Sequence, residues 1–103
     1  MATIQATLDR PIVEARDAVL RTAPAQGWRF QPAQSLEDVL VLTKGVSLVS
    51  WGAKMTVQLR ATAPDSTHLT LITGETLSIA DWGRGKNAIR RLLDAIGGHE
   101  ATD

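Results

Sequence analysis

Residues 54–62 read Lys-Met-Thr-Val-Gln-Leu-Arg-Ala-Thr, which is the cleanest strand pattern in the chain. Met55, Val57, Leu59 and Ala61 alternate with polar residues along its length. Because successive side chains of a strand point to opposite faces, this period of two predicts a β-strand with one buried face and one open face. The short connections between the predicted central strands are compatible with hairpins, so we expect an antiparallel sheet.

The flanking sequence supplies further strands at short intervals. Residues 3–8, 28–31 and 67–73 also alternate, and the segment 63–66, Ala-Pro-Asp-Ser, has the composition of a turn between two of the strands. Trp28 and Phe30 alternate with Arg29, so we expect the two rings to point toward the core. Pro32 then limits ladder pairing, which places residues 28–31 near a sheet edge.

Residues 39–43, Val-Leu-Val-Leu-Thr, are apolar on both faces and predict a central strand. Its orientation stays open: Leu40 and Leu42 face outward if Val39 and Val41 face inward, or the reverse. An outward apolar row would need a cover. We therefore expect Leu40 and Leu42 to contact a partner or ligand.

Two segments change to helical spacing. The first begins at Asp9-Arg10-Pro11, with Asp9 as the expected N-cap, and ends near Pro24 or Gly27. The second begins at Asp81, another candidate N-cap, and ends at residues 97–98, Gly-Gly. The expected buried stripes are Ile12, Val13, Ala15, Ala18, Val19, Leu20 and Ala23 in the first, and Ile89, Leu92, Leu93 and Ile96 in the second.

These elements predict an α+β domain over residues 1–98, followed by a flexible tail at 99–103. We expect a single antiparallel sheet of four to five strands, with the N-terminal and C-terminal helices on one face. This order looks like half of a TATA-binding-like fold or a helix-grip fold, a comparison that is an analogy of architecture.

Composition narrows the classes of function. The chain has 103 residues, 11 basic and 11 acidic, and no cysteine. A net charge of zero disfavours a protein devoted to duplex DNA or an anionic membrane, and the absence of cysteine excludes disulfides and thiolate chemistry. The start of the chain lacks signal-peptide character and no apolar run reaches the roughly 18 residues of a membrane span, so we expect a cytoplasmic protein.

Catalytic groups do not converge in the sequence. Asp65, Ser66 and His68 have the residue types of nucleophilic catalysis, but they lie within four positions of one hairpin. The second histidine, His99, lies in the predicted tail, which leaves no set of convergent metal ligands. We therefore predict no enzyme activity, no metal and no cofactor.

A Trp-Gly pair occurs twice, at Trp51-Gly52 and at Trp82-Gly83. Each glycine allows a sharp turn while the ring packs on the core, which is the structural interpretation. In the alternative, Trp51 and Trp82 line a groove for an apolar ligand or a partner side chain.

Cations gather at the start of the second helix, at Arg84, Lys86, Arg90 and Arg91. A helix start favours anions, but the spacing of glycines here matches neither the P-loop nor the dinucleotide fingerprint. The open sheet face offers threonine, glutamine and arginine instead of the aromatic rings on which RNA-binding sheets stack bases. Nucleic-acid binding is thus expected only as a backbone contact of this basic cluster.

Two motifs carry a resemblance to a known group of domains. The first is residues 44–52, Lys-Gly-Val-Ser-Leu-Val-Ser-Trp-Gly, followed by an alternating strand. The second is residues 81–83, Asp-Trp-Gly, which open a helix with Lys86, Asn87 and Ile89. The chain resembles a group of small, uncharacterised bacterial α+β domains. Members tend to run Asp-Trp-Gly-Lys-Asn, whereas Arg84-Gly85 precedes Lys86-Asn87 here. The resemblance implies a sheet with two helices and no particular activity.

These observations favour a binding or interaction module that self-associates or docks a protein or small apolar ligand. The alternative is a binder of anions or nucleic-acid backbones through the basic cluster. The two differ in salt dependence, because screening weakens ionic contacts and leaves apolar burial intact.

Overall fold

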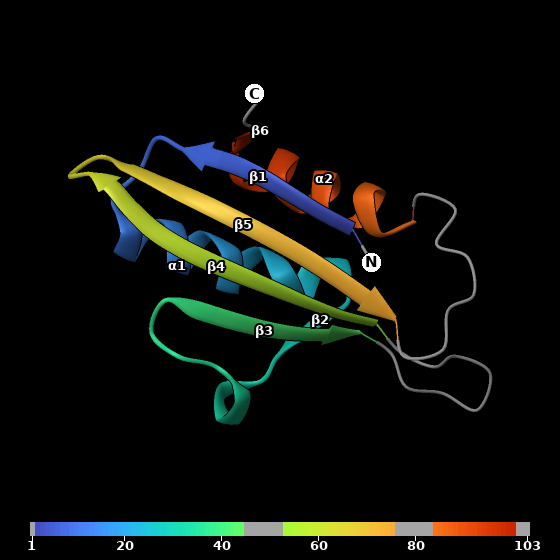
Figure 1. The fold of residues 1–103 in the computed structure, drawn as a ribbon. Helices are drawn as coiled ribbons and strands as arrows, with labels where there is room; N and C mark the ends of the chain where they lie inside the picture. Colours follow the sequence, from blue (N-terminus) through green and yellow to red (C-terminus); the bar gives the residue numbers. More distant parts are fainter. Residues whose placement is uncertain (1, 45–52, 76–83, 101–103) are drawn as a thin grey trace.

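The protein folds as one antiparallel sheet with two α-helices on one of its faces (Figure 1). The structure, a computed structural model, describes residues 2–44, 53–75 and 84–100. Its elements are β1 (Ala2–Leu8), α1 (Ile12–Thr22), the 3₁₀ turn η1 (Ala23–Gln26), β2 (Trp28–Phe30), the 3₁₀ turn η2 (Pro32–Gln34), β3 (Val39–Lys44), β4 (Ala53–Ala63), β5 (Ser66–Glu75), α2 (Arg84–Ile96) and β6 (His99–Glu100). Among these residues no helix is both long and apolar enough to cross a membrane.

The strand order is β2-β3-β4-β5-β1-β6, with neighbouring strands antiparallel. β2 to β5 form a meander. β1 pairs with β5, and β6 pairs with β1 at the far edge of the sheet. The α+β class and the antiparallel sheet are confirmed. The expected four to five strands are corrected to six by β6, because His99 and Glu100 pair with Thr7 and Ala6 where the sequence predicted a tail.

The core lies between the sheet and the helices. The inward row of β4, Met55, Val57 and Leu59, is buried as its alternation predicts, and Trp28 is buried beside it with Phe30 packed against the core. α2 presents the expected stripe, since Ile89, Leu92, Leu93 and Ile96 are all buried. Ala61 differs from the prediction: it lies exposed beyond Leu59, next to a register shift at the end of the β4–β5 hairpin.

β3 resolves the orientation that its sequence left open. Leu40 and Leu42 are fully buried in the core, opposite Val57 and Met55 of β4. Val39 and Val41 therefore face the open side, where Val41 is only 5% exposed. Residues 31–35 lie against this strand, as shown by hydrogen bonds from the Gln31 N–H to the Val41 oxygen and from the Val41 N–H to the Ser35 hydroxyl.

α1 begins differently from the prediction, whereas it ends near Pro24 and Gly27 as expected. Pro11 takes the N-cap position without a side-chain cap, so the expected cap by Asp9 is wrong. Val13 is 69% exposed, because the core-facing stripe runs through Ala15, Ala18 and Val19 instead. After the helix the chain tightens into η1, which contains Pro24, and reverses at Gly27 with a left-handed φ of 86°.

Candidate functional site

The predicted contact residues do not form one surface. Trp51, Trp82 and the expected cap Asp81 lie outside the described residues. Leu40 and Leu42 lie in the core, so the expectation that they contact a partner is corrected: both side chains are already covered by this chain's own helices. Of the predicted contact residues, those left for a binding surface are the cations of α2.

The cations of α2 point in different directions. Lys86, Arg90 and Arg91 are all exposed, while the side chain of Arg84 lies outside the described residues. The Arg90 Nε donates to a carboxylate oxygen of Glu100 in β6 at 3.1 Å, which directs it toward that edge of the sheet. Arg91, one position on and about 100° around the helix, turns toward η1 instead. The structure therefore separates Arg90 from Arg91 and gives them different surroundings.

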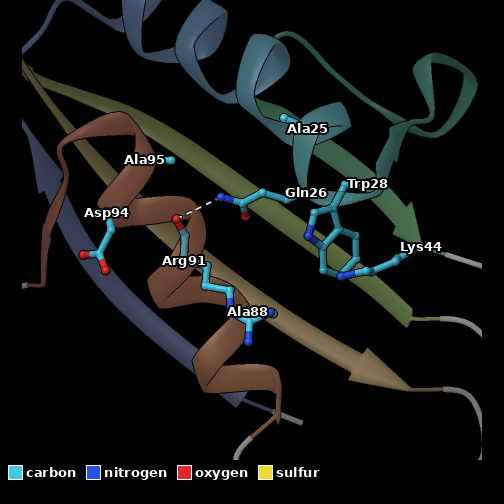
Figure 2. Close-up of a pocket in the computed structure, with 8 residues that line it drawn as sticks. All are labelled: Ala25, Gln26, Trp28, Lys44, Ala88, Arg91, Asp94 and Ala95. Atoms are coloured by element: carbon cyan, nitrogen blue, oxygen red, sulfur yellow. Dashed lines mark hydrogen bonds between the residues drawn. The ribbon is translucent and has the colours of Figure 1, made fainter.

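Arg91 lines a groove between η1 and α2 with a volume of about 570 Å³. Figure 2 draws the residues that line it. The lining residues are Ala25, Gln26, Trp28, Lys44, Ala88, Arg91, Asp94 and Ala95. Small alanine side chains leave the space open, since larger residues at these positions would fill it.

Trp28 and Lys44 form one end of this groove. They are directly opposite each other in the β2–β3 register, and the Lys44 ammonium lies 5.4 Å from the centre of the indole ring, within cation–π range. Trp28 is only 3% exposed, and the lysine side chain over the ring is one part of its cover, together with the core residues around it. Gly27 allows this approach, because a Cβ built at this position would lie 3.2 Å from the Lys44 Cε.

The charges in the groove are unevenly placed. In Figure 2 the Arg91 side chain extends toward the end held by Trp28 and Lys44, whereas the Asp94 carboxylate points away from them. The side-chain amide of Gln26 donates to the main-chain oxygen of Arg91 at 3.0 Å, which joins the two walls. The groove thus has a cationic end next to a covered aromatic ring.

The remaining predicted groups lie elsewhere. Asp65 is exposed in the β4–β5 turn, Ser66 begins β5, and His68 lies on the open face of the sheet opposite Arg60. Thr56, Gln58, Arg60 and Thr70 occupy the open face, as the alternation predicts. Within the described ranges, no three His, Cys, Asp or Glu side chains gather as a metal site would require.

Sequence reasoning missed the groove. It assigned Trp28 to the core, which is correct, but it did not place Lys44 over the ring or Arg91 beside it. The only sequence signal was the predicted edge strand at 28–31, whose register with 39–44 determines the Trp28–Lys44 pair. Comparison with models of known protein families and with curated proteins found no match to this chain.

Proposed function

We propose that this domain is a binding module whose groove between η1 and α2 takes a small ligand with a planar apolar part and an acidic group. The observation that carries the proposal is the joint lining of one hollow by Trp28, Lys44 and Arg91. A volume of about 570 Å³ falls within the roughly 300–1,000 Å³ typical of ligand pockets.

The apolar part of the ligand would lie among the alanines and against Trp28. Because Lys44 covers the indole, this contact requires the lysine to move off the ring. A carboxylate or sulfonate would give the displaced ammonium an ion-pair partner, and Arg91 would offer a planar fork for the same group. An acidic group on the ligand would therefore help to draw Lys44 away from the Trp28 indole.

This proposal joins the two alternatives that the sequence left open, apolar docking and anion binding. Self-association through β3 has less support, because Leu40 and Leu42 are in the core and Val41 is nearly covered. A basic surface for nucleic-acid backbones also has less support, because Arg90 pairs with Glu100 and points away from Arg91. The β-α-β₄-α order of β1 to α2 agrees with the helix-grip or TATA-binding-like comparison, which we retain as a hypothesis about fold family.

The proposal is tested with 2-naphthoate and its neutral isostere 2-naphthamide as probes, titrated into the protein and followed by NMR. We expect naphthoate to shift the indole N–H of Trp28 and the side-chain amide of Gln26, and to bind several-fold more tightly than the amide. Added salt should narrow this difference, because it screens the exposed cations.

The matched variants are Arg91→Gln and Arg90→Gln, which remove the same charge from adjacent positions of α2. Arg91→Gln and Lys44→Met should each reduce the preference for naphthoate, and Arg90→Gln should leave it unchanged. Equal affinity for the two probes, or equal effects of the two arginine variants, would contradict the proposal.

A further inference from the structure

A second hollow lies on the opposite side of the sheet, on the face that the helices leave open. It has a volume of about 440 Å³, and its polar lining residues are Gln5, Asp38, Gln58, Arg60, His68 and Thr70. None of these residues belongs to the groove of the proposed function. The two sites can therefore be tested separately.

Strand register brings the lining residues together in two adjacent rows. In one row Arg60 of β4 lies opposite His68 of β5. In the next, Gln58 lies opposite Thr70, which in turn lies opposite Gln5 of β1. Neighbouring strands are about 5 Å apart, and the two rows are two positions apart along β4 and β5, so all five side chains point to the same face.

Asp38 adds the opposite charge at the edge of this surface. Its main-chain oxygen accepts a hydrogen bond of 2.8 Å from the Leu59 N–H, which holds it beside the residue that precedes Arg60. Asp38 and Arg60 are both exposed, and within the described part of the chain no ion pair joins them. Both residues line the hollow, so its lining includes one acidic and one basic residue that are not paired with each other.

We propose that this hollow binds a small zwitterion of the α-amino-acid class. The ligand carboxylate is held by the guanidinium of Arg60, with the His68 imidazole as a further donor, and the ligand ammonium is held by Asp38. Gln5, Gln58 and Thr70 offer donors and acceptors to a polar ligand side chain.

Charge complementarity selects this ligand over simpler ones. A lone anion would meet repulsion from Asp38, and a lone cation would meet repulsion from Arg60. A second copy of this face fits poorly, because Arg29, Lys54 and Arg60 all point outward from it and would approach the same cations of the other copy.

The test compares three probes that differ only in charge: norleucine, hexanoate, which lacks the ammonium, and pentylamine, which lacks the carboxylate. Binding is followed by NMR shifts of the backbone amides at 58–60 and 68–70. We expect norleucine to bind up to about fivefold more tightly than either single-charge analogue, which is the upper end of what an exposed ion pair supplies. Hexanoate or pentylamine binding as well as norleucine would overturn the proposal.

Single substitutions then test which residue binds the ligand carboxylate and which binds its ammonium. Arg60→Gln should abolish the advantage of norleucine over pentylamine, and Asp38→Asn should abolish its advantage over hexanoate. Lys54→Gln, on the same strand and face but outside the hollow, is the control and should change neither. An unchanged probe preference in Arg60→Gln or Asp38→Asn would overturn the assignment, and the spectra themselves report whether each variant is folded.

Discussion

The side-chain amide of Gln26 donates a hydrogen bond of 3.0 Å to the main-chain oxygen of Arg91, 65 positions away in the sequence (Figure 2). This bond joins η1 to α2 across the candidate groove. Since an intramolecular hydrogen bond contributes a net of about 0.5–1.5 kcal/mol, it is a modest but directed connection between the two walls. Its position at the groove suggests that it fixes the separation of the walls.

Gln26→Met should lower the free energy of unfolding by no more than about 1.5 kcal/mol, because only this bond is removed and the site is partly solvated. It should also speed hydrogen exchange of backbone amides in α2. Urea unfolding and NMR measure the two effects. Gln34→Met is the control, since Gln34 is an exposed amide in η2. Equal exchange rates in α2 for the two variants would contradict the role given to Gln26.

Leu42→Ala should lower the free energy of unfolding by about 2–5 kcal/mol, because Leu42 is fully buried and its truncation leaves a cavity. Val39→Ala, on the other face of the same strand, should cost about 1 kcal/mol or less. Urea unfolding of both variants, with light scattering as a check on association, tests this. A Leu42→Ala protein that changed its oligomeric state at unchanged stability would contradict the core position.

The alternation of apolar and polar residues predicted most of the strands. The alternation at 54–62 predicted the inward row Met55, Val57 and Leu59 because polar residues mark its other face. The same reasoning could not orient residues 39–43, which are apolar on both faces. That choice depends on the pairing of Leu40 with Val57 and of Leu42 with Met55, which is a relation between strands.

The candidate sites were harder to predict than the fold. The groove depends on the register of Trp28 with Lys44, set by a three-residue edge strand, and on the turn of α2 that aims Arg91 and not Arg90 at η1. β6 was missed because a pair of residues is too short to show any period; its pairing with β1 and the Arg90–Glu100 contact are tertiary.

Gly97→Ala should lower the free energy of unfolding by about 1–2 kcal/mol, because Gly97 has a left-handed φ of 79°. Nothing lies within 4 Å of a Cβ built there, so the loss reflects the backbone alone. The residue ends α2 in a Schellman arrangement, with the Gly98 N–H donating to the Leu93 oxygen at 2.8 Å and the Gly97 N–H to the Asp94 oxygen at 3.4 Å.

Gly97→Asn is the matched variant, because asparagine enters the left-handed region more readily than alanine. Urea unfolding should therefore rank the stabilities as wild type, then Gly97→Asn, then Gly97→Ala. An alanine variant as stable as the asparagine variant would show that the conformation of residue 97 does not govern the end of α2.

Thr67 connects β5 to the turn between β1 and α1. Its side chain is fully buried, and its hydroxyl donates a hydrogen bond of 2.8 Å to the main-chain oxygen of Arg10. Thr67→Val keeps the shape and removes the donor, which leaves that carbonyl without this partner. We expect a loss of about 0.5–1.5 kcal/mol in the free energy of unfolding, the net contribution of one hydrogen bond, because the bond itself is only partly buried.

Thr70→Val is the control, since Thr70 is half-buried on the open face of the same strand and its substitution should change stability by about 0.5 kcal/mol or less. Urea unfolding of the two variants gives the comparison, and hydrogen exchange in the first turn of α1 locates the effect. Because the Arg10 carbonyl lies just before α1, Thr67→Val should speed hydrogen exchange more in the first turn of α1 than in the rest of the helix. Equal stability of the two variants would mean that the hydroxyl of Thr67 does not hold the β1–α1 connection in place.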